Sequence, residues 1–156
     1  MDRESFNKLL RENLPCVWEG LHVHVVEVTP DHVTVQIPMA GNGNDKGTMF
    51  AGASYSALVV AGWCLVMNQA FASGFKKPWA AIVDAHCHYA KPVAEDALAT
   101  ATFAEPPVLV PGARNWPKVT VQIGEQIAFE GVYAVGEQKS RGLHDEHQPA
   151  LSTWRS

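Results

Sequence analysis

Most of the residues that could do chemistry lie in one short segment, Asn44-Asp45-Lys46-Gly47-Thr48-Met49-Phe50-Ala51-Gly52-Ala53-Ser54-Tyr55. A loop rich in Gly and Asn, residues 40–47, leads here into a helix start built from small residues. Small side chains let a ligand approach the unpaired backbone N–H groups of a helix start, which carry partial positive charge. Such donors hold a phosphate or a developing oxyanion. Small residues at this place also let a helix pack closely against a strand, and the sequence leaves both interpretations open.

This segment does not match the common nucleotide or nucleophile motifs. Lys46 precedes Gly47, whereas in a P-loop the lysine follows the glycine. In the G-x-G-x-x-G pattern that begins at Gly41, Lys46 stands where the third glycine is required. Ser54 lacks the G-x-S-x-G elbow of a nucleophilic serine. We therefore expect its hydroxyl to bind a ligand or to cap the helix.

A second group of candidates is Asp84, His86 and His88, which period two places on one face of a strand. Ligands at i, i+2 and i+4 span about 13 Å, which is too far for one metal ion to hold all three. Two of them would need a third ligand from elsewhere, such as His22 or His24. We expect no metal and no cofactor. Two other interpretations stay open: a polar strand face at water or at a subunit interface, and Asp84 or His86 as the general base for a water molecule.

The hydrophobic period predicts the elements that position these residues. Short turns join the later strands, so these strands are antiparallel neighbours. One long helix is apolar nearly all round and must be wrapped by the sheet, which predicts an α+β fold. We expect a single domain over residues 1–136 and a C-terminal tail over 137–156. The expected elements are a helix at 5–14, strands at 21–26 and 32–37, the long helix at 50–72, and strands at 79–90, 97–104, 115–123 and 126–135.

Composition excludes several classes of protein. The 156 residues carry a formal charge of −4, which argues against a nucleic-acid binder. Three cysteines without a C-x-x-C pair argue against a disulfide framework and predict a cytoplasmic location. Residues 49–75 contain no charged residue, a stretch that is long enough for a membrane span. The continuous apolar run within them, 57–67, is shorter than a span requires and has the length typical of a buried core helix. We therefore expect no membrane span.

The order of the elements resembles the hotdog fold, in which an antiparallel sheet wraps one long central helix. The sequence more closely resembles the thioesterase family named for the YiiD C-terminal domain, over about residues 5–136. Three motifs carry this resemblance: Asn44-x-Lys46-Gly47-Thr48-x-Phe50-x-Gly52-x-x-Tyr55-Ser56, Ala61-Gly62-Trp63, and Ile82-Val83-x-Ala85-x-x-x-Tyr89-x-x-Pro92-Val93.

The resemblance implies an acyl-CoA or acyl-carrier-protein thioesterase of fatty acid metabolism. It implies a homodimer joined through strand edges, or a tetramer built from such dimers, with the site near the start of the central helix. The acyl chain would run along the apolar helix, and the thioester carbonyl oxygen would lie at the amides of Ala51 and Gly52. The expected substrate-binding residues are Asn44, Lys46, Gly47, Thr48, Phe50, Ala51, Gly52, Ser54 and Tyr55.

The sequence departs from the pattern of many hotdog thioesterases in two places. Phe50-Ala51-Gly52 stands where they carry His-Gly-Gly, and the long helix has no Asp or Glu to act as the base. This shifts the expected catalytic role to Asp84 or His86, from the same or a partner subunit. The missing acid favours a second hypothesis, a non-catalytic module that binds an acyl thioester or a carrier protein. A hydratase or dehydratase on the same fold is a third.

Overall fold

The computed structural model describes residues 1–138, so the predicted tail lies outside the described residues from position 139 onward. The order of the helices and strands is the predicted one, with a short π-helix, η1, added after the first helix. The elements are α1 (Arg3–Asn13), η1 (Cys16–Gly20), β1 (His24–Val28), β2 (His32–Ile37), α2 (Ala51–Ala72), β3 (Pro78–Tyr89), β4 (Ala97–Phe103), β5 (Lys118–Ile123) and β6 (Ile127–Glu137).

Two strands, β1 and β5, begin three residues later than predicted. β1 starts at His24 because Leu21 has helical backbone angles and His22 has a positive φ of 55°. β5 starts at Lys118, since Pro117 has no N–H to donate to a ladder. Asn115, the predicted first residue of that strand, forms an isolated bridge instead.

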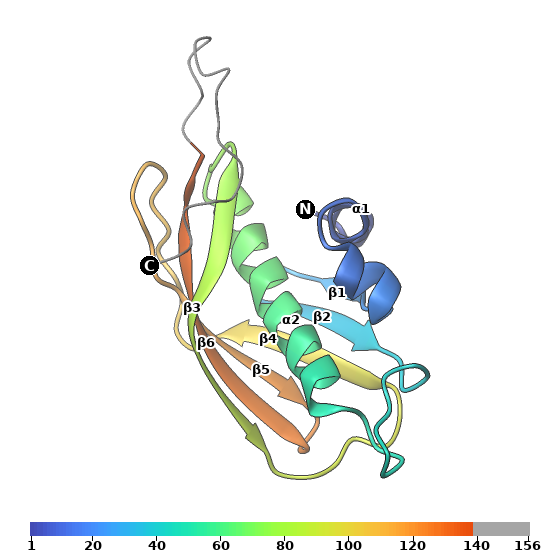
Figure 1. Ribbon diagram of the computed structural model, residues 1–156. Helices are drawn as coiled ribbons and strands as arrows, with labels where there is room; N and C mark the ends of the chain where they lie inside the picture. Colours follow the sequence, from blue (N-terminus) through green and yellow to red (C-terminus); the bar gives the residue numbers. More distant parts are fainter. Residues whose placement is uncertain (139–156) are drawn as a thin grey trace, which may run out of the picture.

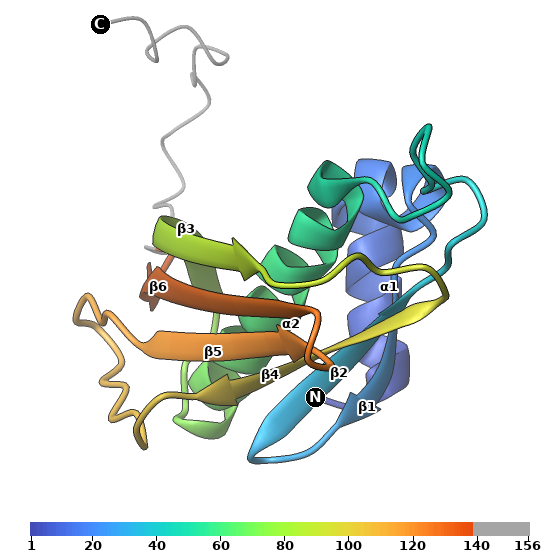
Figure 2. The ribbon, with the colours of Figure 1, turned by 90° about the horizontal axis from the view of Figure 1, so that it is seen from below.

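The six strands form one antiparallel sheet in the order β1-β2-β4-β5-β6-β3. Figure 1 shows the sheet curving around α2, and Figure 2 shows the strands side by side with β1 and β3 at the two edges. This confirms the predicted α+β fold with one long helix against a wrapped sheet.

α2 is the centre of the hydrophobic core. Its residues Leu58, Leu65 and Val66 are fully buried, together with Val33 and Val121 from the sheet. By length and composition α2 could cross a membrane, but 56% of its apolar window is buried inside the protein. That burial is typical of a core helix and agrees with the expectation drawn from the sequence.

α1 covers the β1 edge of the sheet. Asp2 is its N-cap, accepting a hydrogen bond from Ser5 N at 2.8 Å, and Phe6 lies buried on its inner face. The Asn7 side chain donates to Val25 O at 2.9 Å and accepts from Val25 N at 2.8 Å. A side chain of α1 thus satisfies outward-facing backbone groups of β1, which blunts that edge.

Candidate functional site

The loop before α2 is held by the side chain of Asn44. Its Oδ1 accepts from the backbone N–H groups of Lys46 at 2.9 Å and Thr48 at 3.1 Å, and its Nδ2 donates to Thr48 Oγ1 at 2.9 Å. Gly47 turns the chain within this loop with a φ of +74°, which glycine adopts without strain. Asn44 and Gly47, both expected to bind substrate, therefore shape the loop that leads to the helix.

The start of α2 presents backbone donors without partners. Phe50 is the N-cap and supplies no side-chain hydrogen bond. Its carbonyl accepts from Ala53 N at 3.0 Å and Ser54 N at 3.2 Å. Within residues 1–138, the N–H groups of Ala51 and Gly52 have no hydrogen-bond acceptor. These two amides point backward out of the first turn, as N–H groups do at every helix start.

A cavity of about 280 Å³ lies at this helix start. It brings together residues from the loop, from α2 and from the segment that follows β3. Five of the expected substrate-binding residues line it: Asn44, Lys46, Thr48, Ala51 and Ser54. Of the residues that the structure describes, no Asp, Glu or His lines this cavity, and its charged groups are Lys46 and Lys91.

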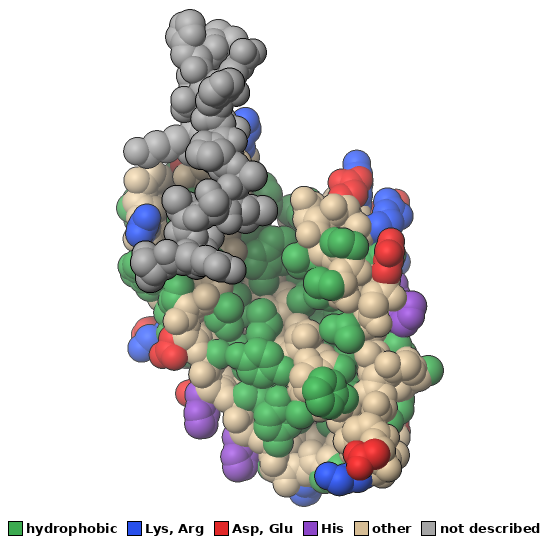
Figure 3. All heavy atoms as spheres, in the orientation of Figure 1, with side chains coloured by type: hydrophobic (Ala, Val, Ile, Leu, Met, Phe, Trp, Pro, Cys, Tyr) green, Lys and Arg blue, Asp and Glu red, His purple; other side chains and the backbone are tan. Residues whose placement is uncertain are grey.

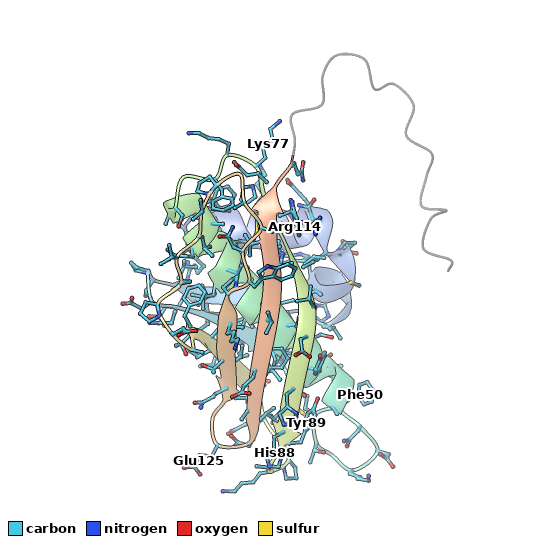
Figure 4. All side chains as sticks on the ribbon, turned by 90° about the vertical axis from the view of Figure 1, so that its left-hand side faces the viewer. Phe50, Lys77, His88, Tyr89, Arg114 and Glu125 are labelled. Atoms are coloured by element: carbon cyan, nitrogen blue, oxygen red, sulfur yellow. The ribbon has the colours of Figure 1, made fainter. Side chains whose placement is uncertain are left out.

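Tyr89 also lines the cavity, and the sequence reasoning did not select it as a site residue. Its hydroxyl donates to Ala51 O at 3.1 Å, and Figure 4 shows it at the end of β3, at the same end of the molecule as Phe50. Burial raises the pKa of Tyr89 to about 12, with Cys87 adding to the increase and Ser54 opposing it. The one signal for this residue was its place in the motif that resembles the thioesterase family.

The remaining expected residues lie beside the cavity. Phe50 is 58% exposed, and its ring covers Gly52 so closely that a Cβ there would overlap it. Tyr55 is half-buried and packs edge-on against Phe129, with 5.7 Å between ring centroids. Ser54 is buried, and its hydroxyl donates to Ala51 O at 3.0 Å. The Ser54 hydroxyl therefore forms a hydrogen bond within the helix, and its predicted role in binding a ligand stays a prediction.

Asp84 and His86 lie on the opposite face of the sheet from α2. In the ladder with β6, Cys87 pairs with buried Phe129, whereas His86 pairs with exposed Glu130. A bulge at Val83 sets this orientation, because it interrupts the alternation between Ile82 and Asp84. With Lys118, Thr120 and Glu130 they line a separate hollow of about 360 Å³. The structure does not bring them to the helix start of their own chain.

His88 shares this outer face with Asp84 and His86. Across residues 1–138, no group of three His, Cys, Asp or Glu side chains could hold a metal ion.

An apolar groove of about 630 Å³ runs along α2, bounded by α1 and by β3. Figure 3 shows hydrophobic side chains gathered down the middle of this face of the molecule. The groove begins at Val59, about two turns into α2. It extends past the C-terminal end of α2 to Lys76 and Lys77. The acyl chain was predicted to run along this helix, and the groove is an open apolar space beside it. Its apolar lining includes Leu9, Val59, Trp63, Met67, Phe71, Trp79 and Ile82.

Comparisons with known proteins agree with this architecture. A family model described as "Putative thioesterase (yiiD_Cterm)" matches residues 3–135. A putative thioesterase from Shewanella oneidensis has a similar structure, with a TM-score of 0.70 and 22% identity over 85% of this chain and 95% of that chain. A thioesterase from Haemophilus influenzae has a TM-score of 0.64 and 15% identity over 95% and 96% of the two chains.

A protein of unknown function from Chlorobaculum tepidum is also similar, with a TM-score of 0.71 and 17% identity over 87% of this chain and 94% of that chain. Among curated proteins, none matches this sequence significantly. At these identities the structural likeness establishes the fold alone, and that fold is the hotdog fold predicted from the sequence.

Proposed function

The chain belongs to the YiiD C-terminal family of putative thioesterases, and from that premise we propose that it hydrolyses acyl thioesters of coenzyme A or of acyl carrier protein. One observation carries the proposal. The N–H groups of Ala51 and Gly52, which have no acceptor within residues 1–138, lie at the start of a buried helix beside a cavity, and an apolar groove begins about two turns further along that helix. This arrangement suits a polar carbonyl attached to an apolar chain.

The amides, the groove and the lysines each act on a different part of the substrate. The thioester carbonyl oxygen accepts hydrogen bonds from the two amides, which stabilise the negative charge that develops when water attacks the carbonyl carbon. The tetrahedral intermediate then expels the thiolate, which takes a proton, and the products are a carboxylic acid and a free thiol. The acyl chain lies along the groove beside α2. Lys46 and Lys91 stand at the cavity, where their charges suit the phosphates of coenzyme A or of a carrier-bound phosphopantetheine.

Activation of the attacking water needs a base, and among the described residues no carboxylate or imidazole lines the cavity of one chain. We propose Asp84, with His86 beside it, as the group that orients the water. Because both side chains lie on the outer face, they reach the cavity only if another subunit brings them there. We also propose that the protein is cytoplasmic and forms a homodimer joined through the β3 edge. Because such a dimer continues the sheet and keeps Asp84 and His86 on its outer face, the subunit that brings them to a cavity belongs to a second dimer, in a tetramer.

A second candidate function is a non-catalytic module that binds an acyl thioester. One specific observation favours it: among the described residues, no carboxylate and no imidazole lines the cavity at the helix start. Such a module would bind the same thioesters without releasing thiol.

The test is thiol release from a panel of short, long and aryl acyl-CoA substrates. Ala51→Pro removes one proposed donor while keeping the helix, because Ala51 is the first helical residue, where proline is well tolerated. We expect kcat to fall about 100- to 1,000-fold, the cost of one lost oxyanion donor. Arg3→Pro is the matched control, since Arg3 is the first helical residue of α1. It should leave kcat unchanged.

Asp84→Asn is measured in the same panel. Loss of turnover with unchanged acyl-CoA binding supports the proposed base, and full activity contradicts that assignment. If wild-type protein binds the panel but releases no thiol, the thioesterase proposal is wrong and the binding module replaces it. Equal kcat in Ala51→Pro and wild type contradicts the placement of the carbonyl oxygen.

A further inference from the structure

Two side-chain hydroxyl groups converge on a single backbone carbonyl at the start of α2. Tyr89 Oη donates to Ala51 O at 3.1 Å, and Ser54 Oγ donates to the same oxygen at 3.0 Å. Ser54 belongs to the helix itself, whereas Tyr89 reaches the carbonyl from the end of β3. Tyr89 therefore ties the first turn of the helix to the sheet.

The carbonyl of Ala51 and the N–H of Gly52 belong to one peptide group. In a planar trans peptide these two groups point in opposite directions, so a contact that fixes the carbonyl also fixes the N–H. The described chain contains no cis peptide bond. Donation to a carbonyl oxygen also polarises the peptide and makes its N–H a stronger donor. Both effects act on the Gly52 amide, which has no acceptor within residues 1–138.

We propose that Tyr89 is a positioning residue, whose hydroxyl orients and polarises the peptide between Ala51 and Gly52 so that the Gly52 N–H is presented to a thioester carbonyl oxygen. This inference rests on the proposed function, because it assigns that amide a role in the reaction. Ser54 cannot replace Tyr89 in this role, since its hydroxyl moves with the helix that it would have to orient. The phenol supplies an anchor from another element.

The chemistry of the phenol suits this role. Tyr89 keeps its proton through the neutral range, because a phenol ordinarily has a pKa of about 10. Burial raises the pKa of Tyr89 further, to about 12. It is therefore a constant hydrogen-bond donor under ordinary assay conditions. We expect no ionisation of Tyr89 in the pH profile of the reaction below about pH 10.

The first test measures the NMR resonance of the Gly52 amide. Protein labelled with ¹⁵N-glycine gives a simple ¹H–¹⁵N spectrum, because the chain has 12 glycines. The Gly52 resonance is assigned by its loss in Gly52→Ala. In Tyr89→Phe we expect this resonance to move upfield in the nitrogen dimension, as an amide does when its peptide carbonyl loses a donor. This measurement needs no substrate.

Ser56→Ala is the matched control. The Ser56 hydroxyl donates to Gly52 O at 2.9 Å, so the variant removes a similar bond from the next peptide group. We expect the Gly52 resonance to keep its position in this control. If it stays fixed in Tyr89→Phe as well, or moves equally in both variants, the inference is wrong.

The second test is kinetic. Tyr89→Phe should lower kcat about five- to tenfold, the usual effect of one neutral hydrogen bond, with KM within about twofold of wild type. Ser56→Ala should keep both constants. A raised KM with unchanged kcat overturns the inference, because it indicates that the phenol binds substrate instead. If wild type releases no thiol at all, the proposed function fails, while the Gly52 spectrum still decides whether Tyr89 controls the peptide.

Discussion

At the scale of single residues, the polar side chains of Asn44 and Ser54 near the site form hydrogen bonds within the protein itself. Asn44, expected to bind substrate, lines the cavity, and its side-chain oxygen and nitrogen also form hydrogen bonds with the backbone of Lys46 and with Thr48. The Ser54 hydroxyl is likewise engaged with Ala51 O. Within residues 1–138, the backbone N–H groups of Ala51 and Gly52 have no acceptor, and an inventory of side chains does not include them.

His24 makes stability depend on pH. Its ring packs edge-on against Trp18, with 4.3 Å between centroids, and burial lowers its pKa below 6.5, assisted by the charge of His22. Between the lowered pKa and 6.5, the unfolded chain binds more protons than the folded one, so stability falls as the pH drops through this window.

We expect His24→Gln to remove this part of the acid sensitivity. Urea unfolding of wild type and variant between pH 5 and 8 measures it. Above pH 7.5 the two free energies of unfolding should differ by a constant, which serves as the internal control. Parallel curves through the whole range, including below pH 6.5, contradict the prediction.

At the scale of elements, the contact between α2 and β6 depends on a glycine. Tyr133 is fully buried, and its hydroxyl donates to Val59 O at 2.7 Å. A Cβ at Gly62 would lie 2.5 Å from that hydroxyl oxygen and 3.0 Å from Tyr133 Cζ. The helix therefore lies as close to β6 as it does because position 62 has no side chain.

Gly62→Ala should destabilise the protein by about 2 kcal/mol, through overpacking and a disturbed buried hydrogen bond. Helix propensity alone predicts the opposite, because alanine is favoured over glycine inside a helix by about 1 kcal/mol. Denaturant unfolding measures the change.

The double variant Gly62→Ala/Tyr133→Phe is the control for this mechanism. Because Tyr133→Phe removes the closest of the atoms that the methyl group would meet, the cost of the double variant should be less than the sum of the two single costs. Additive costs, or a more stable Gly62→Ala, contradict the proposed contact.

At the scale of the whole molecule, the two edges of the sheet are treated differently. β1 is short, is bulged between Val25 and Glu27, and is covered by Asn7 of α1. β3 has 12 residues, and it pairs with β6 on one side alone. Long edge strands of this kind pair with another chain unless they are protected.

We expect Val83→Lys to convert the proposed dimer to a monomer, because the lysine places a charge in the middle of the β3 edge. Leu98→Lys is the matched control, since both side chains are 53% exposed and Leu98 lies on inner strand β4. Light scattering after size-exclusion chromatography gives the masses. Dimers in both variants, or a monomeric wild type, argue against the β3 edge as the interface.

Much of this protein was determined by sequence pattern alone. Apolar period and turn residues predicted the order of the two main helices and six strands, and the uncharged run over 49–75 identified the core helix. Period two also placed Asp84, His86 and His88 on one face. These features are local, so neighbouring residues contain the information that specifies them.

The tertiary structure decided which face of β3 meets α2. Counting by two from Ile82, which packs against the core, would turn Asp84 toward the helix, but the bulge at Val83 turns it away. The hydrogen bond from Tyr89 to Ala51 O likewise joins residues that are 38 positions apart in the sequence. Bulges, register and hydrogen bonds between distant elements depend on how the sheet closes around its helix. No local period encodes that closure, because it is set by packing of the whole chain.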